Sequence, residues 1–174
     1  MNILVLGGNN VHNSKWVDSI VAKLIPKHAA KAIYYDHWTE PDKTINFELE
    51  YLKLVSTFNK MSNGQYIIVA KSAGILISLD FVCKTDLAPT HIICVGLPIN
   101  FTSIINVNLE ELLAVCSAKT KVTLIQQTND PEGSFNEVSK LCSKYENINC
   151  IEWPGSTHDY DAEELVKFVI ESLK

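Results

Sequence analysis

The chain has 174 residues, 47% apolar and 20% charged, as expected for one globular domain with a sizeable core. Its net charge is −5 and all fifteen basic residues are lysine, which argues against a nucleic-acid partner, since such binding favours a basic surface and arginine. The five scattered cysteines are typical of reduced thiols, and no apolar run has membrane-spanning length. We therefore predict a single cytoplasmic domain over residues 1–174 that does not bind a membrane.

Apolar periodicity predicts six short strands that alternate with six helices. In the first half we expect strands at 3–6, 32–35 and from 66 to just before Ser72, and helices at 14–24 (with Ser14 as N-cap), 46–58 and from 73 to about 82, with a loop at 36–43. In the second half we expect strands at 91–95, 121–126 and 148–153, helices at 109–117, 134–145 and 161–173, a ten-residue loop before position 109, a turn at 129–133 and a loop at 154–160.

This alternation favours an α/β fold in which parallel strands are joined by right-handed crossovers. We predict a three-layer, doubly wound sandwich of six mostly parallel strands in the order 2-1-3-4-5-6, with helices on both faces and no lid domain. In such a sheet ligands bind at the carboxyl ends of the strands, where the strand order reverses. That point lies between strands 1 and 3, so residues 7–10 and Ser72 should be neighbours.

The segment Ala70-Lys71-Ser72-Ala73-Gly74 joins a predicted buried strand to a predicted helix. Small residues flank Ser72, as a sharp strand-to-helix turn requires, because its strained apex leaves no room for large side chains. The pattern is a variant of the Gly-x-Ser-x-Gly nucleophile elbow. Ser72 is therefore our candidate nucleophile, although a small-x-Ser-x-Gly sequence also arises by chance.

A serine nucleophile needs a histidine base and an acid that orients this base. His158 follows the sixth strand and Asp130 follows the fifth, so both should lie at the same sheet edge as Ser72. Each also has a structural interpretation, because Asp130 precedes a proline in a turn and His158 lies in a loop. The alternatives are Glu132 for the acid and His12 or His37 for the base.

The oxyanion hole would use the backbone N–H of Ala73 and a second donor from the loop after strand 1, either Asn9 or Gly8. The glycines of this loop do not continue into a dinucleotide-binding pattern, and no metal-ligand spacing is recognisable. We therefore predict neither a cofactor nor a metal. The residues that we expect to contact the substrate are Asn10, Lys71, Phe101 and Ile104.

The whole chain resembles a minimal single-domain α/β hydrolase, similar to the small serine hydrolases related to retinoblastoma-binding protein nine. The resemblance lies in four segments: Gly7-Gly8-Asn9, Ala70-Lys71-Ser72-Ala73-Gly74, Asn129-Asp130-Pro131 and Gly155-Ser156-Thr157-His158. It implies the same nucleophile, base and acid. The chain departs from the pattern at Ala70, where the elbow usually has glycine, and at Lys71, where such enzymes often have histidine.

The leading functional hypothesis is a serine hydrolase that cleaves a small acyl ester, thioester or amide. The short segment 100–108 stands where larger relatives insert a lid, so we expect an open site. The alternatives are a non-catalytic interaction protein on the same fold and a flavodoxin-like binding module. Nothing in the sequence points to a particular protein partner.

Overall fold

The computed structural model describes residues 1–40, 43–61 and 64–173. Within this part of the chain, six parallel strands form one sheet in the order β2-β1-β3-β4-β5-β6. The strands are β1 (Asn2–Leu6), β2 (Ala29–Ile33), β3 (Tyr66–Lys71), β4 (His91–Val95), β5 (Lys121–Gln127) and β6 (Ile148–Trp153). The predicted order and parallel arrangement are confirmed.

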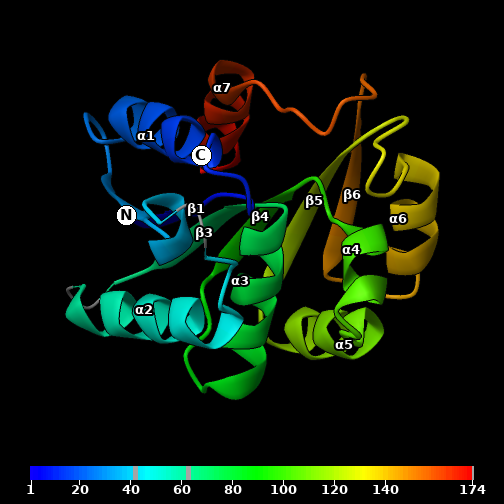
Figure 1. Cartoon of the computed structure of the whole chain (residues 1–174), viewed down its shortest axis with the longest axis horizontal. Helices are drawn as coiled ribbons and strands as arrows, with labels where there is room; N and C mark the ends of the chain where they lie inside the picture. The colour runs from blue at the N-terminus through cyan, green and yellow to red at the C-terminus, as the bar shows by residue number, and fades with distance from the viewer. Residues whose placement is uncertain (41–42, 62–63, 174) are drawn as a thin grey trace.

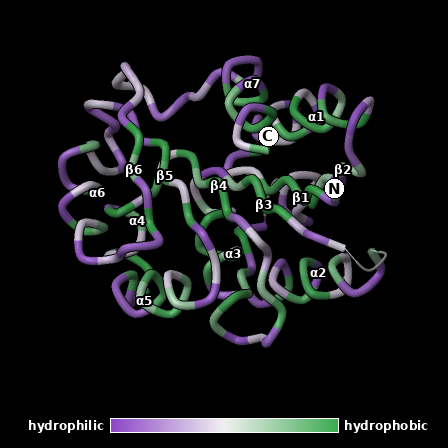
Figure 2. Tube along the Cα trace, turned by 180° about the vertical axis from the view of Figure 1, so that it is seen from behind, coloured by the Kyte–Doolittle hydropathy of each residue, from purple (hydrophilic) through white to green (hydrophobic). Residues whose placement is uncertain are grey.

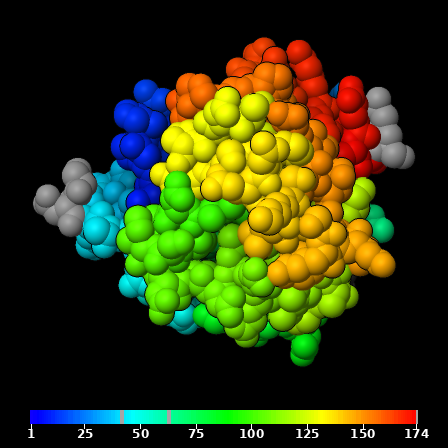
Figure 3. Space-filling model, turned by 90° about the vertical axis from the view of Figure 1, so that its right-hand side faces the viewer, coloured from blue at the N-terminus to red at the C-terminus, as the bar shows by residue number. Residues whose placement is uncertain are grey.

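Helices cover both faces of this sheet (Figure 1). Helices α1 (Asn13–Leu24) and α7 (Ala162–Ser172) pack together on one face, while α2 (Phe47–Lys60), α3 (Ala73–Lys84) and α5 (Leu109–Lys119) pack on the other. A 3₁₀ helix, η1 (Asp36–Trp38), follows β2, and the short α4 (Ile99–Ile104) follows β4. Helix α6 (Phe135–Cys142) packs on β5 and β6, at the edge of the molecule that faces the viewer in Figure 3.

The core lies between the sheet and its two helical layers. The four central strands β1, β3, β4 and β5 are almost entirely buried, and they are rich in Ile, Val and Leu. Figure 2 shows these strands as mostly hydrophobic, while many of the outer turns of the helices are hydrophilic. Burial on both faces is what selects apolar runs without strict alternation in a parallel sheet.

Five predictions about these elements are wrong. The second strand lies at Ala29–Ile33, three residues before the predicted start. The predicted loop before α5 contains α4, and α6 ends at Cys142 and not at position 145. Ser14 is not an N-cap: α1 begins at Asn13, and the amide of His12 just before it donates to Asn10 Oδ1 at 2.9 Å. The predicted 36–43 loop contains η1 and extends into residues 41–42, which lie outside the described part.

Candidate active site

The loops that leave β1 and β3 meet at the carboxyl edge of the sheet. In the β1–β3 register Leu6 lies beside Ala70, so the next residues of each loop are brought side by side. The amide of Gly74 donates to the carbonyl of Gly7 at 3.1 Å. A Cβ placed on Gly8 would lie only 3.1 Å from the Cβ of Ser72. The sequence prediction that these two turns are neighbours is therefore confirmed.

Ser72 lies at the apex of the turn between β3 and α3. Its backbone has φ 51° and ψ −119°, a conformation that side chains rarely adopt. Its amide donates to the carbonyl of Val95 at 3.1 Å, which ties the apex to β4. The turn therefore holds a half-buried hydroxyl beyond the end of the sheet, immediately before the first amides of a helix.

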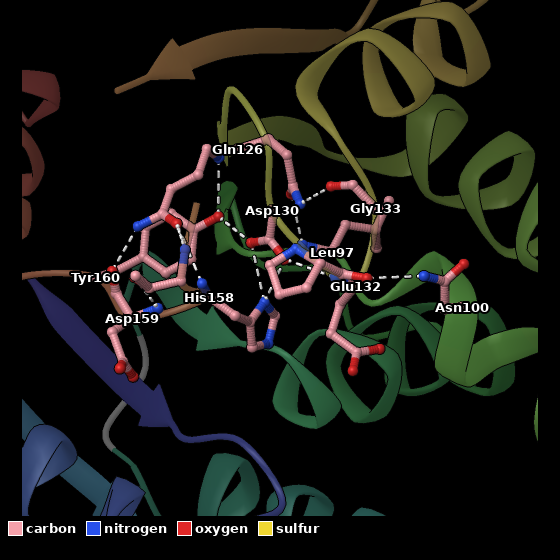
Figure 4. A network of polar contacts seen from close by, with 12 residues as sticks. Leu97, Asn100, Gln126, Asp130, Glu132, Gly133, His158, Asp159 and Tyr160 are labelled. Carbon is pink, nitrogen blue, oxygen red and sulfur yellow. Dashed lines mark hydrogen bonds and ion pairs between the residues drawn. The ribbon is translucent and has the colours of Figure 1, made fainter. Parts of the chain in front are cut away.

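His158 and Asp130 lie in hydrogen-bond contact (Figure 4). The Nδ1 of His158 is 2.8 and 2.9 Å from the two carboxylate oxygens of Asp130. When Nδ1 carries the proton that it donates to this carboxylate, Nε2 is left as an acceptor. Nε2 is buried and has no hydrogen-bond partner among the described residues. The pair thus presents an unoccupied basic nitrogen, as a general base requires.

Several donors hold the Asp130 carboxylate, which is fully buried. Tyr160 donates its hydroxyl to Oδ2 at 2.6 Å, and the amide of Glu132 donates to Oδ1 at 2.9 Å. Burial alone would raise the pKa of Asp130, but the hydrogen bonds from His158, Tyr160 and Glu132 outweigh it and lower this pKa below its ordinary value. Asp130 is therefore ionised at neutral pH and can stabilise a charged imidazole.

Two glutamines at the end of β5, neither of which was predicted from the sequence, hold the loops around this pair in place. The side-chain oxygen of Gln127 accepts from the amides of Thr157 and His158, at 2.8 and 3.1 Å. Gln126 accepts from the amide of Leu97 at 2.7 Å and donates to the carbonyl of Gly133 at 2.5 Å. The sequence signal for this role is a pair of glutamines at the end of an apolar strand, because polar side chains that are buried there need hydrogen-bond partners.

The backbone amides proposed for the oxyanion hole point to no acceptor among the described residues. Ala73 and Asn9 both line the cavity in front of Ser72, and the amide of neither makes a hydrogen bond within this part of the chain. The carbonyl of Asn9 accepts hydrogen bonds from Nε2 of His37 at 2.6 Å and from Nε1 of Trp38 at 3.2 Å. These two contacts from η1 fix the orientation of the peptide unit after Asn9.

The cavity at this edge, which we call the elbow cavity, has a volume of about 300 Å³. It is lined by ten residues: Asn9, Asn10, Asn13, Lys71, Ser72, Ala73, Pro98, Phe101, Glu132 and His158. The structure thus brings together most of the predicted site residues. Asp130 and Gly8 do not line the cavity themselves, but Asp130 contacts His158 and Gly8 lies against Ser72. Ile104 is outside the site, since it is 80% exposed and does not line the cavity.

The alternative bases and acid lie in different places. His12 and His37 do not line the elbow cavity, while Glu132 does. His91 stands at the opposite end of β4, where its Nε2 lies 2.9 Å from the hydroxyl of Thr123. No cluster of metal-ligating side chains occurs among the described residues. Within the same residues, no helix has the length and apolarity needed to cross a membrane.

No protein-family model matches the sequence, and no curated protein matches it. Solved structures do match over nearly the whole chain. A thioesterase domain from the curacin biosynthetic pathway has a TM-score of 0.72 and 8% identity over 97% of this chain and 90% of its own. Ferulic acid-bound Est1E from Butyrivibrio proteoclasticus has a TM-score of 0.74 and 12% identity over 99% and 87%.

Naproxen esterase from Bacillus subtilis also has a TM-score of 0.74 and 12% identity, over 99% of this chain and 83% of its own. The architecture of the chain is therefore the α/β-hydrolase fold, and its structural neighbours are esterases, thioesterases and other hydrolases. Identities this low carry the fold alone, so the reaction has to be argued from the site.

Proposed function

We propose that this chain is a serine hydrolase that cleaves a small acyl ester, thioester or amide through an acyl-enzyme. Ser72 is the nucleophile, His158 the base and Asp130 the residue that orients the base. The observation that carries the proposal is the buried Nε2 of His158, which has no hydrogen-bond partner among the described residues and belongs to a side chain that lines the same cavity of about 300 Å³ as Ser72. A buried polar atom without a partner is costly in a folded protein, so a functional reason for it is expected.

In the proposed reaction, the Ser72 hydroxyl attacks the acyl carbon while Nε2 of His158 takes its proton. The ionised Asp130 stabilises the imidazolium that forms. The amides of Ala73 and Asn9 donate to the oxyanion, with Gly8 the other candidate donor. His158 then protonates the leaving group, and a water activated by the same nitrogen releases the acid.

We further propose that the chain is a minimal hydrolase of the type related to retinoblastoma-binding protein nine. The support is the short connection between β4 and α5, which holds only the six-residue α4 where larger relatives insert a lid. We propose a small-molecule substrate and a cytoplasmic location. The five free cysteines are consistent with such a location.

A fluorophosphonate probe tests this proposal without knowledge of the substrate. A phosphonate mimics the tetrahedral intermediate, so it needs the nucleophile, the base and the oxyanion donors but no matching substrate pocket. We expect one adduct, on Ser72, detected by intact-protein and peptide mass spectrometry. The adduct should be lost in Ser72→Ala and in His158→Ala.

Ser156→Ala is the matched control, because Ser156 is an exposed serine two residues before the candidate base. This variant should label like the wild type. A folded wild type that stays unlabelled beside a labelled reference hydrolase would favour the non-catalytic interaction protein. Labelling that survives in His158→Ala would instead assign the base to another histidine.

A further inference from the structure

Lys71, the residue before the candidate nucleophile, is a buried lysine without a strong partner. Its side chain is 7% exposed. Its nearest carboxylate is that of Asp159, with Nζ and Oδ1 3.7 Å apart. The ammonium also lies 5.7 Å from the centre of the Trp16 ring, where the negative face of an aromatic ring attracts a cation.

This environment leaves the charge of Lys71 incompletely compensated. Burial lowers the pKa of Lys71, and Asp159 offsets only part of this effect. The carboxylate of Asp159 is 92% exposed, and ion pairs with exposed partners contribute little. A largely buried ammonium whose carboxylate partner is exposed gains stabilisation when a further anion accompanies it.

Lys71 also lies where two cavities meet. One is the elbow cavity, and the other, which we call the side cavity, has a volume of about 370 Å³ between α1 and the loop before α7. Four residues line both: Asn10, Asn13, Lys71 and His158. Trp16 and Asp159 line the side cavity alone. A ligand that reacts at Ser72 could therefore extend past Lys71 into the side cavity.

We propose that Lys71 binds a carboxylate of the substrate, so that the preferred substrates are acyl compounds that carry a second, anionic carboxyl group. This inference rests on the proposed function and specifies its substrate class. In the absence of substrate, Asp159 occupies the position of the anion. When the substrate carboxylate arrives, the exposed side chain of Asp159 turns into solvent.

The charges around the cavities favour a monoanion over a phosphate. Among the residues that the structure describes, Lys71 is the only lysine that lines either cavity, whereas Glu132 lines the elbow cavity and Asp159 the side cavity. A phosphate dianion would meet repulsion from these carboxylates and find a single cation to offset it. A carboxylate carries one negative charge, which one ammonium can match.

The test compares pairs of para-nitrophenyl esters of equal chain length. One ester of each pair ends in a methyl group and the other in a free carboxylate, in a series from glutarate to suberate. We expect the wild type to prefer the carboxylate ester at one or more chain lengths. Lys71→Gln should lower the ratio of kcat/KM values, carboxylate over neutral, by about tenfold or more, because a charge-assisted hydrogen bond is lost.

Two further variants make the result specific. Asp159→Asn should raise the same ratio, because it removes the anion that competes for Lys71. Lys15→Gln makes the same change of net charge at an exposed position beside Trp16 and should leave the ratio unaltered. An unchanged ratio in Lys71→Gln, or an equal fall in Lys15→Gln, would overturn the inference while the proposed hydrolase function stood.

A binding measurement covers the case in which no ester is hydrolysed. Calorimetry would measure the binding of free glutarate, adipate and suberate to two proteins: the single variant Ser72→Ala and the double variant Ser72→Ala, Lys71→Gln. We expect binding of one or more of them in the single variant and its loss, by about tenfold or more, in the double variant. Equal binding, or none, in both variants would contradict the role of Lys71. If the protein neither hydrolyses the esters nor reacts with the fluorophosphonate, but binding still depends on Lys71, only the proposed reaction would be contradicted.

Discussion

Asp130 is the residue that couples the candidate base to the rest of the fold. It accepts from His158, Tyr160 and the amide of Glu132, so each of its oxygens has at least two donors nearby. Burial and the bond to Asp130 raise the pKa of Tyr160, which keeps this hydroxyl a donor at all ordinary pH values. The carboxylate therefore stays ionised and fixed in direction, which in turn selects the Nδ1–H tautomer of His158.

Exchange of Asp130 for asparagine tests this coupling. An asparagine amide can donate to Nδ1 and would hold the imidazole in the wrong tautomer, with Nε2 protonated. We expect kcat on a neutral para-nitrophenyl ester to fall on the order of a thousandfold or more in Asp130→Asn. Circular dichroism should show an unchanged fold.

The matched control is Glu132→Gln, the other acid at the elbow cavity. This variant should cost much less activity than Asp130→Asn. A larger loss in Glu132→Gln would move the role of the acid to Glu132.

At the scale of elements, the site depends on how closely α3 approaches the end of β1. A Cβ at Gly74 would lie 2.7 Å from the carbonyl oxygen of Gly7 and 2.8 Å from the Cβ of Leu6. Both contacts are shorter than real Cβ atoms show, and one of them is with backbone that cannot rotate away. Glycine at this position therefore allows the elbow and the β1 loop to stand side by side.

Gly74→Ala should push these two loops apart. We expect a loss of about 1–3 kcal/mol in the free energy of unfolding and, in addition, a fall of about tenfold or more in the rate of fluorophosphonate labelling, because the proposed oxyanion donors move. Chemical denaturation and labelling kinetics measure the two effects separately.

Val122→Ala provides the comparison, since Val122 is fully buried near the start of β5, at the far edge of the sheet. It should lose similar stability through a cavity but keep its labelling rate. Equal labelling in the two variants would show that the close approach at Gly74 serves stability alone.

The strand order and the meeting of the site loops followed from the sequence, because β1, β3 and β4 are buried apolar runs that are each followed by glycine or serine. The second strand lies earlier in the sequence than predicted, and the reason is its pairing with β1, which the sequence of the second strand alone does not reveal. In the β1–β2 register Leu6 lies beside Ile33, so Tyr34 and Tyr35 extend past the end of β1 and have no strand to pair with. Both tyrosines have a high β propensity, but β1 is too short to pair with them, so β2 ends before they are reached.

Two other features depended on contacts between distant residues. Helix α4 follows a proline without a side-chain cap, but the amide of Asn100 donates to the carbonyl of Glu132 at 3.0 Å, in the turn after β5. Tyr160 reaches Asp130 across thirty positions of sequence, again through a side chain with no local signal. The sequence therefore predicts which residues gather at the carboxyl edge of the sheet. The contacts that hold them there join distant segments and are visible only in the folded structure.

At the scale of the whole molecule, stability should respond to pH through His91. This histidine is the first residue of β4 and is buried beside β5, and burial lowers its pKa to about 4, with a smaller effect from Lys121. The unfolded chain binds the proton near the ordinary pKa of about 6.5. Between these values the unfolded state holds more protons, so stability is present above pH 6.5 and is lost as the pH falls toward 4.

Urea unfolding measured across this pH range should therefore show a decline in the free energy of unfolding, on the order of 3 kcal/mol from this group. His91→Gln keeps a polar group near Thr123 but removes the titration, so its decline should be shallower. His12→Gln makes the same chemical change on the surface. Equal declines in these two variants would contradict the assignment to His91.

The backbone at two of the candidate catalytic positions has a conformation that costs stability. Ser72 and His158 both have positive φ, at 51° and 62°, where a side chain costs about 1–3 kcal/mol that glycine would avoid. A lineage that no longer needed turnover would gain stability by drifting to glycine at either position. A hydroxyl and an imidazole at these two places therefore cost the fold stability, and the proposed reaction would account for that cost.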